Sequence, residues 1–322
     1  MAQIALVTGA AGFVGQHLVR TLSANNSNIS IVAWKRPERL SKSTTTWLSM
    51  ANQPQVEWQQ VDLLDTNKVR SAIEEIKPND IYHCAGIASA NSSWNNTLTL
   101  LEGNIRATHN LFHSLKSVTG SVRVLIPGSA LVYRASNRIL NEDDPLAPTS
   151  PYGLSKLAQE MLAQRYLENR IAVIITRSFT HIGPGQNTSY AASSFAHQIA
   201  KIESGLQEPV IRVGNLDAQR DITDVRDTVR AYTSLMEDGL PGHPYNVCSG
   251  KAQRIGDVLD TLLTQSTVPV RVQTDSSRVR QNDNSVLVGD NSRLTDATGW
   301  QPRITLQQTL SDLLDYWRHA VV

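Results

Sequence analysis

The chain has 322 residues, of which 40% are hydrophobic and 18% charged, and its formal net charge is +1. This composition suits a globular protein with one large core and a smaller attached lobe. The near-zero charge argues against a nucleic-acid surface, and no apolar run reaches the roughly 20 residues that a membrane-spanning helix needs.

The first half of the chain alternates short apolar runs with amphipathic stretches. The apolar runs are rich in β-branched residues and predict strands at residues 3–7, 29–34, 56–61, 81–84, 122–126 and 172–176. Helical patterns lie between them, at residues 13–24, 66–76, 97–116 and 153–167. This alternation predicts an α/β fold with a Rossmann-type, doubly wound parallel sheet.

After Arg177 the pattern loosens, and glycine and proline separate shorter elements. We expect a Rossmann domain over residues 1–177 plus about 245–251, with Tyr245 to Cys248 returning to the sheet as a late strand. Residues 178–244 and 252–322 would form a smaller α/β substrate lobe. Its last helix would bury one face, made of Leu306, Leu310, Leu313, Leu314 and Trp317.

The strand at residues 3–7 leads directly into the segment TGAAGFVG at residues 8–15. Gly9 permits a tight turn, Gly12 lets the backbone approach a pyrophosphate, and Gly15 allows close packing of the next helix. The amino terminus of that helix offers N–H groups to phosphates. The segment therefore predicts a dinucleotide site.

The end of the second expected strand carries Lys35 and Arg36, where NAD enzymes usually carry a carboxylate. Two cations suit the 2′-phosphate of NADP, which we favour over NAD. Asp62, after the third expected strand, is a candidate contact for the adenine.

Tyr152 and Lys156 are four residues apart at the start of an expected helix, so both point to one side. An ammonium near a phenol favours the phenolate, so we expect Lys156 to lower the pKa of Tyr152. Ser129 follows the strand expected at 122–126, at the sheet edge that faces ligands. Its hydroxyl could bind a substrate carbonyl or cap a turn.

Other polar residues are candidates for substrate contacts. His181 lies in a loop rich in glycine and proline, and Arg220 and Arg280 lie in loop-like stretches of the expected second lobe. Guanidinium groups suit a diphosphate. We find no cluster of metal-ligating residues and expect no metal site. Cys84 and Cys248 lie in apolar segments and the chain starts without a signal sequence, so we expect buried, reduced thiols and a cytoplasmic protein.

Together these motifs resemble the extended short-chain dehydrogenase/reductase family over nearly the whole chain. The matching segments are residues 8–15, Asp62-Leu63, HCAG at 83–86, Asn104, SALVY at 129–133, YGLSK at 152–156 and RSFTHIGP at 177–184. VGNLDAQRD at 213–221, YNVCSG at 245–250 and TGWQP at 298–302 are similar to the GDP-sugar members, above all to the reductases of GDP-4-keto-6-deoxy-mannose.

The resemblance implies site residues. It implies Ser129, Tyr152 and Lys156 as the catalytic triad, and Thr180, His181, Arg220, Arg280 and Asp283 as substrate contacts. The expected cofactor contacts are Gly9, Gly12, Phe13, Val14, Gly15, Lys35, Arg36, Asp62, Leu63, Ala85, Gly86, Asn104, Tyr152 and Lys156. It also implies a homodimer in which helices 97–116 and 153–167 pair with their symmetry mates as a four-helix bundle.

The chain departs from the family pattern at three points. Dehydratases of this family follow the serine or threonine with Asp-Glu, whereas Ala130 and Leu131 follow here and cannot do acid–base work. Thr180 stands where many relatives have asparagine, and Arg134 stands where glycine is usual.

These features predict an NADPH-dependent 4-ketoreductase that acts on a nucleotide-activated 4-keto-6-deoxy sugar, with a GDP-sugar favoured. A sugar-nucleotide 4-epimerase that keeps its NAD is the alternative with the same triad. A non-catalytic NADP-sensing or scaffold protein is a third hypothesis, against which the Tyr152–Lys156 pair argues.

Overall fold

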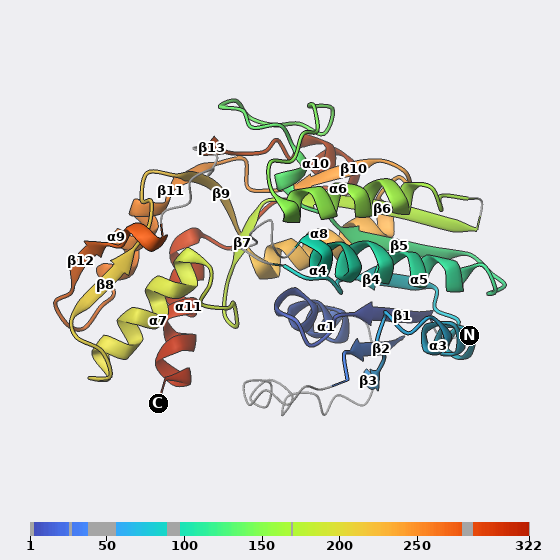
Figure 1. The fold of residues 1–322 in the computed structure, drawn as a ribbon, viewed down its shortest axis with the longest axis horizontal. Coiled ribbons are helices and arrows are strands. Elements are labelled where there is room, and N and C mark those ends of the chain that lie inside the picture. The colour runs from blue at the N-terminus through green and yellow to red at the C-terminus, as the bar shows by residue number, and fades with distance from the viewer. Residues whose placement is uncertain are drawn as a thin grey trace.

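A seven-stranded parallel sheet forms the centre of the larger part of the molecule (Figure 1). The computed structural model describes residues 3–25, 28–37, 56–88, 97–168, 170–278 and 286–321. The strands of the sheet are β1 (Gln3–Thr8), β2 (Ile29–Lys35), β3 (Val56–Gln60), β4 (Asp80–His83), β5 (Val122–Pro127), β6 (Ile171–Ser178) and β10 (Pro244–Val247). Their order is β10-β6-β5-β4-β1-β2-β3, so the direction of winding reverses between β1 and β4. In such folds ligands bind at that reversal.

The predicted α/β class and doubly wound sheet are confirmed. The six strands expected in the first half are present with ends shifted by one or two residues. The expected late strand is also present: β10 pairs with β6, and Tyr245 lies opposite Thr176.

Helices cover both faces of this sheet, which is why its strands are apolar on both sides. On one face, α1 (Phe13–Asn25), α8 (Val225–Asp238) and α10 (Ser292–Thr298) share a core that includes Leu18, Tyr232 and Trp300. On the other face, α3 (Thr66–Ile76), α5 (Ala107–Leu115) and α6 (Pro151–Gln164) contribute Ile73, Phe112 and Ala163.

The helix expected at residues 97–116 is interrupted. It consists of α4 (Thr97–Leu101), a π-helical turn η3 (Glu102–Arg106) and α5. A Cβ at Gly103 would lie 2.5 Å from the Ile87 side chain, so this wider turn brings its backbone close to the loop after β4. Single π-helical turns often lie at functional sites.

A second assembly lies beside the large sheet and holds a separate core (Figure 1). Strands β7 (Thr180–Ile182), β9 (Gln219–Asp224), β11 (Ala252–Arg254) and β13 (Val286–Leu287) form one sheet, and β8 (Val210–Val213) pairs with β12 (Arg271–Thr274). Its helices are α7 (Ala191–Glu203), α9 (Ile255–Leu263) and α11 (Leu306–Ala320). Leu310, Leu313 and Leu314 of α11 are buried there, and Leu306 and Trp317 pack against them as expected.

The boundary between two domains stays a prediction. Helices α8 and α10 fall in the ranges expected for the smaller lobe, yet they pack on the large sheet with α1. A long-range fold-back of this kind leaves no periodic signal in the sequence. Among the helices within the described residues, none combines the length and apolarity that crossing a bilayer requires.

Candidate functional site

The glycine segment forms a tight turn between β1 and α1. Gly9 has a φ of +65°, which favours glycine, and a Cβ there would lie 2.7 Å from the Ala85 backbone. A Cβ at Gly15 would lie 2.3 Å from the Gly9 carbonyl oxygen. The loop and the start of α1 can therefore approach each other, and the first N–H groups of α1 face the carboxyl end of the sheet.

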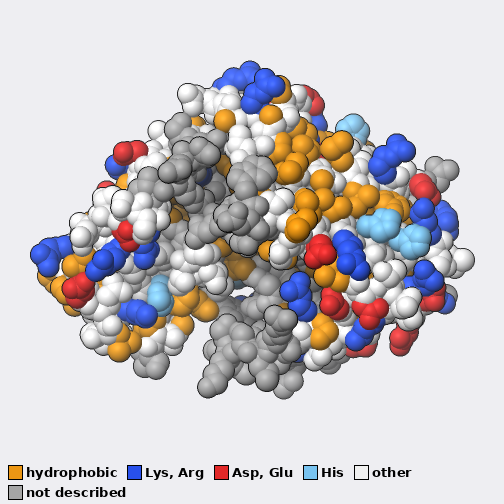
Figure 2. Space-filling model, viewed as in Figure 1, with side chains coloured by type: hydrophobic (Ala, Val, Ile, Leu, Met, Phe, Trp, Pro, Cys, Tyr) orange, Lys and Arg blue, Asp and Glu red, His pale blue; other side chains and the backbone are white. Residues whose placement is uncertain are grey.

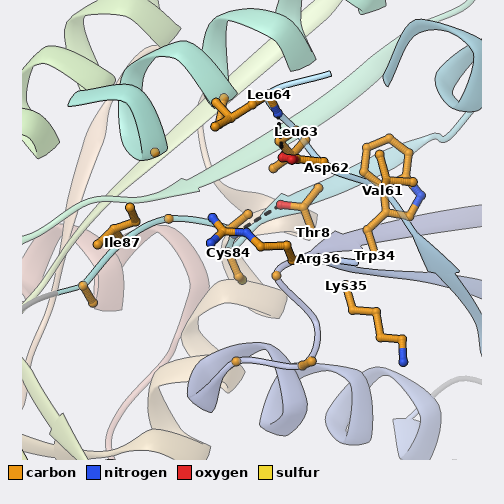
Figure 3. A pocket seen from close by; sticks show the side chains of 18 residues that line it. Thr8, Trp34, Lys35, Arg36, Val61, Asp62, Leu63, Leu64, Cys84 and Ile87 are labelled. Atoms are coloured by element: carbon orange, nitrogen blue, oxygen red, sulfur yellow. Dashed lines mark hydrogen bonds between the residues drawn. The ribbon is translucent and has the colours of Figure 1, made fainter. Parts of the chain in front are cut away.

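A cavity of about 460 Å³ opens at this edge, over the ends of β1, β2, β3 and β4 (Figure 3). Eight residues singled out in the sequence line it: Gly9, Gly12, Lys35, Arg36, Asp62, Leu63, Ala85 and Gly86. Ten other lining residues were not singled out as site residues: Thr8, Ala11, Trp34, Val61, Leu64, Cys84, Ile87, Ala88, Gly103 and Ala107. Thr8 ends β1, and Val61 and Cys84 directly follow β3 and β4, a position that could have identified these three.

Lys35 and Arg36 reach the cavity from the end of β2. Figure 3 shows their side chains extending in different directions, so the two cations do not converge on one point. Asp62 accepts a hydrogen bond from the Leu64 N–H at 3.0 Å, which orders the turn after β3. A loop lined by small residues, an apolar wall and cations at the rim together fit a dinucleotide that carries an additional phosphate.

Phe13, Val14 and Gly15 begin α1 and do not line this cavity. The Phe13 ring instead stacks on His181, with 6.1 Å between centroids and 13° between planes. The ring nitrogen Nε2 of His17 lies 2.9 Å from the Pro184 carbonyl oxygen. The start of α1 is thus connected to β7 and the loop that follows it. Burial lowers the pKa of His181.

Ser129, Tyr152 and Lys156 meet at the carboxyl end of β5. The Ser129 hydroxyl accepts from the Leu131 N–H at 3.2 Å, capping the 3-10 turn η4 (Ala130–Val132), and it also hydrogen-bonds the Tyr152 phenol. The turn-capping use considered for this serine is therefore present, and its contact with a substrate carbonyl stays a prediction. The proline and serine at the start of α6 set its position, because Ser150 caps it and Pro151 opens it.

The Lys156 ammonium donates to the Pro127 carbonyl and to Gln159 Oε1, both at 2.7 Å. Burial lowers the pKa of Lys156 to about 8, because removal from water disfavours its charged form.

The expected lowering of the Tyr152 pKa is wrong in this structure. Burial raises that pKa, with further increases from Tyr190 and Tyr232, and the hydrogen bond with Ser129 offsets only part of the effect. The sequence shows the spacing of Tyr152 and Lys156 but not that both are withdrawn from water. A raised pKa keeps the phenol protonated at neutral pH, the form that can donate a proton.

Asn104 lies on the π-helical turn and is fully buried. Its side chain accepts from the Ile87 N–H at 2.8 Å and donates to Ser155 Oγ at 2.8 Å. It thus ties the loop after β4 to α6 and is not among the residues that line the cavity.

The cysteines differ from each other. Cys84 is half-buried and lines the cavity, whereas full burial was expected; burial raises its pKa to about 12. Cys248 is buried as expected, and neither thiol is in a disulfide.

The candidate substrate contacts come from different strands of the smaller sheet. Thr180 and His181 of β7 lie opposite Ile222 and Thr223 of β9. Arg220, also on β9, donates to the Gln219 carbonyl at 2.8 Å. Arg280 and Asp283 lie outside the described residues. Within the described part of the chain, no group of three or more His, Cys, Asp or Glu residues is arranged to hold a metal ion.

Comparison with known proteins places this geometry in context. Residues 6–313 match the family described as GDP-mannose 4,6 dehydratase. The GDP-6-deoxy-D-mannose reductase of Pseudomonas aeruginosa is 33% identical, over 100% of this chain and 99% of the relative. The structure of RMD from Pseudomonas aeruginosa complexed with NADPH has a TM-score of 0.84 and 32% identity, with 99% of each chain covered. A putative epimerase from Burkholderia cenocepacia J2315 has a TM-score of 0.85 and 30% identity, again with 99% of each chain covered.

Proposed function

The chain belongs to the GDP-mannose 4,6 dehydratase family, and on that basis we propose that it is an NADPH-dependent 4-ketoreductase of a nucleotide-activated 4-keto-6-deoxy sugar. The proposed reaction converts GDP-4-keto-6-deoxy-mannose to GDP-rhamnose. The observation that carries the proposal is the meeting of Ser129, Tyr152 and Lys156 beside the cavity, without the carboxylates of a dehydratase. The full-length similarity to a GDP-6-deoxy-D-mannose reductase supports it.

The glycine loop and the cavity would hold the cofactor. The small residues Gly9, Gly12, Ala85 and Gly86 would leave room for its pyrophosphate, and Lys35 and Arg36 favour the extra phosphate of NADP. The bound NADPH would supply the hydride for the C4 ketone. The related structure complexed with NADPH supports this choice over NAD.

The side chains around Ser129 would carry the proton chemistry. The Tyr152 phenol, kept protonated by burial, would give its proton to the developing C4 alkoxide. The Ser129 hydroxyl would donate a hydrogen bond to the ketone oxygen and polarise it. Lys156 would bind the cofactor ribose, and its positive charge would stabilise the tyrosinate that remains.

The residues after Ser129 argue against dehydration. Ala130 is buried and Leu131 is partly exposed in the 3-10 turn, and neither can protonate a leaving hydroxyl or remove a proton from carbon. A reductase needs no such pair, because its substrate is already a ketone.

Substrate binding is assigned to the smaller sheet. Thr180, His181 and Arg220 would contact the sugar nucleotide, with Arg220 toward the diphosphate. Arg280 and Asp283 stay predicted contacts.

We also propose a homodimer in the cytoplasm, where the two free thiols remain reduced. The four-helix bundle would be built from α4, α5 and α6 of each copy. Figure 2 shows hydrophobic side chains gathered over α6, and Leu154 and Met161 of that helix are 39% and 61% exposed. An isologous contact would cover them.

The deciding experiment is incubation of the protein with GDP-4-keto-6-deoxy-mannose and NADPH. Loss of NADPH absorbance with formation of GDP-rhamnose supports the proposal. A cofactor that copurifies as NAD, with interconversion of C4 epimers and no net oxidation, would identify the 4-epimerase instead. Binding of cofactor without any turnover would favour the non-catalytic hypothesis.

A further inference from the structure

A continuous chain of hydrogen bonds runs through the interior from Lys156 to the wall of the cavity. Gln159 accepts from the Lys156 ammonium at 2.7 Å and donates through Nε2 to Thr108 Oγ1 at 2.7 Å. Thr108 Oγ1 lies 2.9 Å from Nε2 of His83, whose Nδ1 lies 2.9 Å from Thr8 Oγ1. The linking side chains, Gln159, Thr108, His83 and Thr8, are each at most 1% exposed.

The chemistry of each group fixes the direction of every bond. The Thr108 hydroxyl must donate to the Asn104 carbonyl oxygen at 2.6 Å, because a carbonyl only accepts. Its two lone pairs then accept from Gln159 and from Nε2–H of His83. His83 is therefore the Nε2–H tautomer, and its Nδ1 accepts from the Thr8 hydroxyl.

The far end of the chain is equally defined. Thr8 Oγ1 accepts from the Ala85 N–H at 3.2 Å while it donates to His83. Thr8 and Ala85 both line the cavity. At the near end, Oε1 of Gln159 must face Lys156, because an ammonium only donates. Hence no hydrogen bond in this series can be reversed in direction without leaving a buried group unpaired.

We propose that Gln159 is a positioning residue that fixes the Lys156 ammonium, and that Thr108 and His83 extend this hold to Thr8 and Ala85 at the cavity wall. The proposal rests on the function proposed above, in which Lys156 binds the cofactor ribose. An amide does not pass protons readily, so the role of Gln159 is to orient Lys156 and to solvate its charge. Lys156 has three N–H groups, and Gln159 with Pro127 uses two of them.

Burial makes Lys156, the group that Gln159 contacts, the one that titrates in this region. The titratable groups that interact with the ammonium are His83, on β4, and Cys84, the residue after it. Tyr152 is the nearby titratable group on the same helix, α6. Burial lowers the pKa of His83 to about 3 and raises that of Cys84 to about 12. Burial raises the pKa of Tyr152 as well. All three groups are thus uncharged near pH 8, where Lys156 loses its proton.

Two substitutions with opposite expected effects test the proposal. In Gln159→Met the acceptor is lost at similar volume, so the pKa of Lys156 falls further. In Gln159→Glu a carboxylate faces the ammonium, so that pKa rises. The alkaline limb of the pH profile should move by about one unit, downward in the first variant and upward in the second. Thr108→Val should also move it downward, and Thr108→Ser should restore it.

The limb is measured in two ways, as kcat/KM for ketone reduction and as NADPH affinity by fluorescence. The second measurement needs no turnover. If the wild type fails to reduce the ketone, the proposed function fails, and the affinity limbs alone then decide the positioning role. Lys156→Met should abolish the limb, and a limb that persists in that variant contradicts the proposal.

Gln198→Met is the matched control. Gln198 is a buried glutamine in α7 whose amide bonds the Arg212 backbone, with Oε1 accepting from its N–H at 2.9 Å. Its loss should lower the melting temperature and leave the alkaline limb unchanged. If both Gln159 variants lose stability in the same way and keep the wild-type limb, Gln159 is only a packing residue and the proposal is overturned.

Discussion

The two sides of the candidate site are built in different ways. On the dinucleotide side, the cavity is lined by residues at the ends of four adjacent strands of one sheet, β1 to β4, and by the loops that follow them. On the substrate side, Thr180 and His181 come from a three-residue strand, β7, and Arg220 comes from β9. β9 pairs in turn with the two-residue strand β13 from far along the chain.

This structural difference suggests that the dinucleotide side determines the chemistry and the substrate side determines the substrate specificity. The dinucleotide side is held by buried bonds such as those of His83 with Thr8 and Thr108, so its geometry is determined by the core. The substrate side is assembled from short segments around a partly exposed arginine. We expect substitutions on the first side to change the rate or the cofactor, and substitutions on the second side to change substrate affinity.

The largest effect should come from Tyr152→Phe. The ring and its packing remain, while the proton donor assigned to the C4 alkoxide is lost. Ketone reduction should slow by about a hundredfold to ten-thousandfold, since general acid catalysis contributes about that much. NADPH affinity, measured by fluorescence titration, should change little because Lys156 and the glycine loop are intact.

Near-normal turnover by Tyr152→Phe would contradict the assignment of the proton chemistry to the dinucleotide side. The proton would then come from the substrate side, with His181 as the first candidate because it stacks on Phe13 beside the loop. A double substitution, Tyr152→Phe with His181→Asn, would then lose the remaining activity.

The same contrast explains what could be read from the sequence. The glycine loop and the Tyr152–Lys156 pair are short motifs whose spacing determines their local geometry, and the parallel sheet follows from its apolar strand pattern. Thr108 and Gln159 belong to no motif. Gln159 meets Lys156 because the two residues are three apart on α6, a spacing that the sequence does show. Gln159 meets Thr108 only because α5 and α6 pack side by side, and such a contact has no signature in sequence spacing.

The pKa values of the site residues are harder still to predict from the sequence. The spacing of Tyr152 and Lys156 predicts that the ammonium lowers the pKa of the phenol. Burial instead has the largest effect on both pKa values, and it raises that of Tyr152. Phe13 shows a similar limit. Its place in the glycine segment suggests a cofactor contact, whereas its ring lies against His181, whose strand is far along the chain.

The second largest effect should be a change of cofactor preference in Arg36→Asp. The substitution replaces a cation at the cavity rim with a carboxylate, which repels a 2′-phosphate and can bind ribose hydroxyls. The ratio of kcat/KM for NADPH to that for NADH should fall by about a hundredfold or more. Arg70→Asp, on the exposed face of α3, makes the same charge change away from the cavity and should keep the ratio. Equal use of both cofactors by the wild type would contradict the assignment of Lys35 and Arg36.

A smaller effect is expected on the substrate side, from Arg220→Met. The apolar stem is kept while the guanidinium assigned to the diphosphate is lost. KM for the sugar nucleotide should rise by about tenfold to a hundredfold, the value of a hydrogen bond between charged groups, with kcat largely retained. Arg254→Met is the matched control. Arg254 lies on the neighbouring strand β11, and its guanidinium is paired with Asp217 at 2.9 Å. A fall in kcat with unchanged KM would place Arg220 with the catalytic side instead.

The smallest effect concerns stability in acid and distinguishes His83 from His181. Burial, aided by the charge of Lys156, lowers the pKa of His83 to about 3 from an ordinary value of 6.5. The unfolded chain therefore binds a proton that the folded protein does not. The stability associated with neutral His83 is present above about pH 6.5 and is lost as the pH falls toward 3. Between about pH 7 and pH 5.5 this should lower the free energy of unfolding by about 1 to 2 kcal/mol.

The pKa of His181 is lowered too, so both sides of the site contribute in the same direction. Urea unfolding at the two pH values should show a weaker pH dependence in His83→Gln, and an unchanged one in His243→Gln, which alters an exposed loop residue. If His83→Gln keeps the full dependence while His181→Gln weakens it, the acid sensitivity belongs to the substrate side.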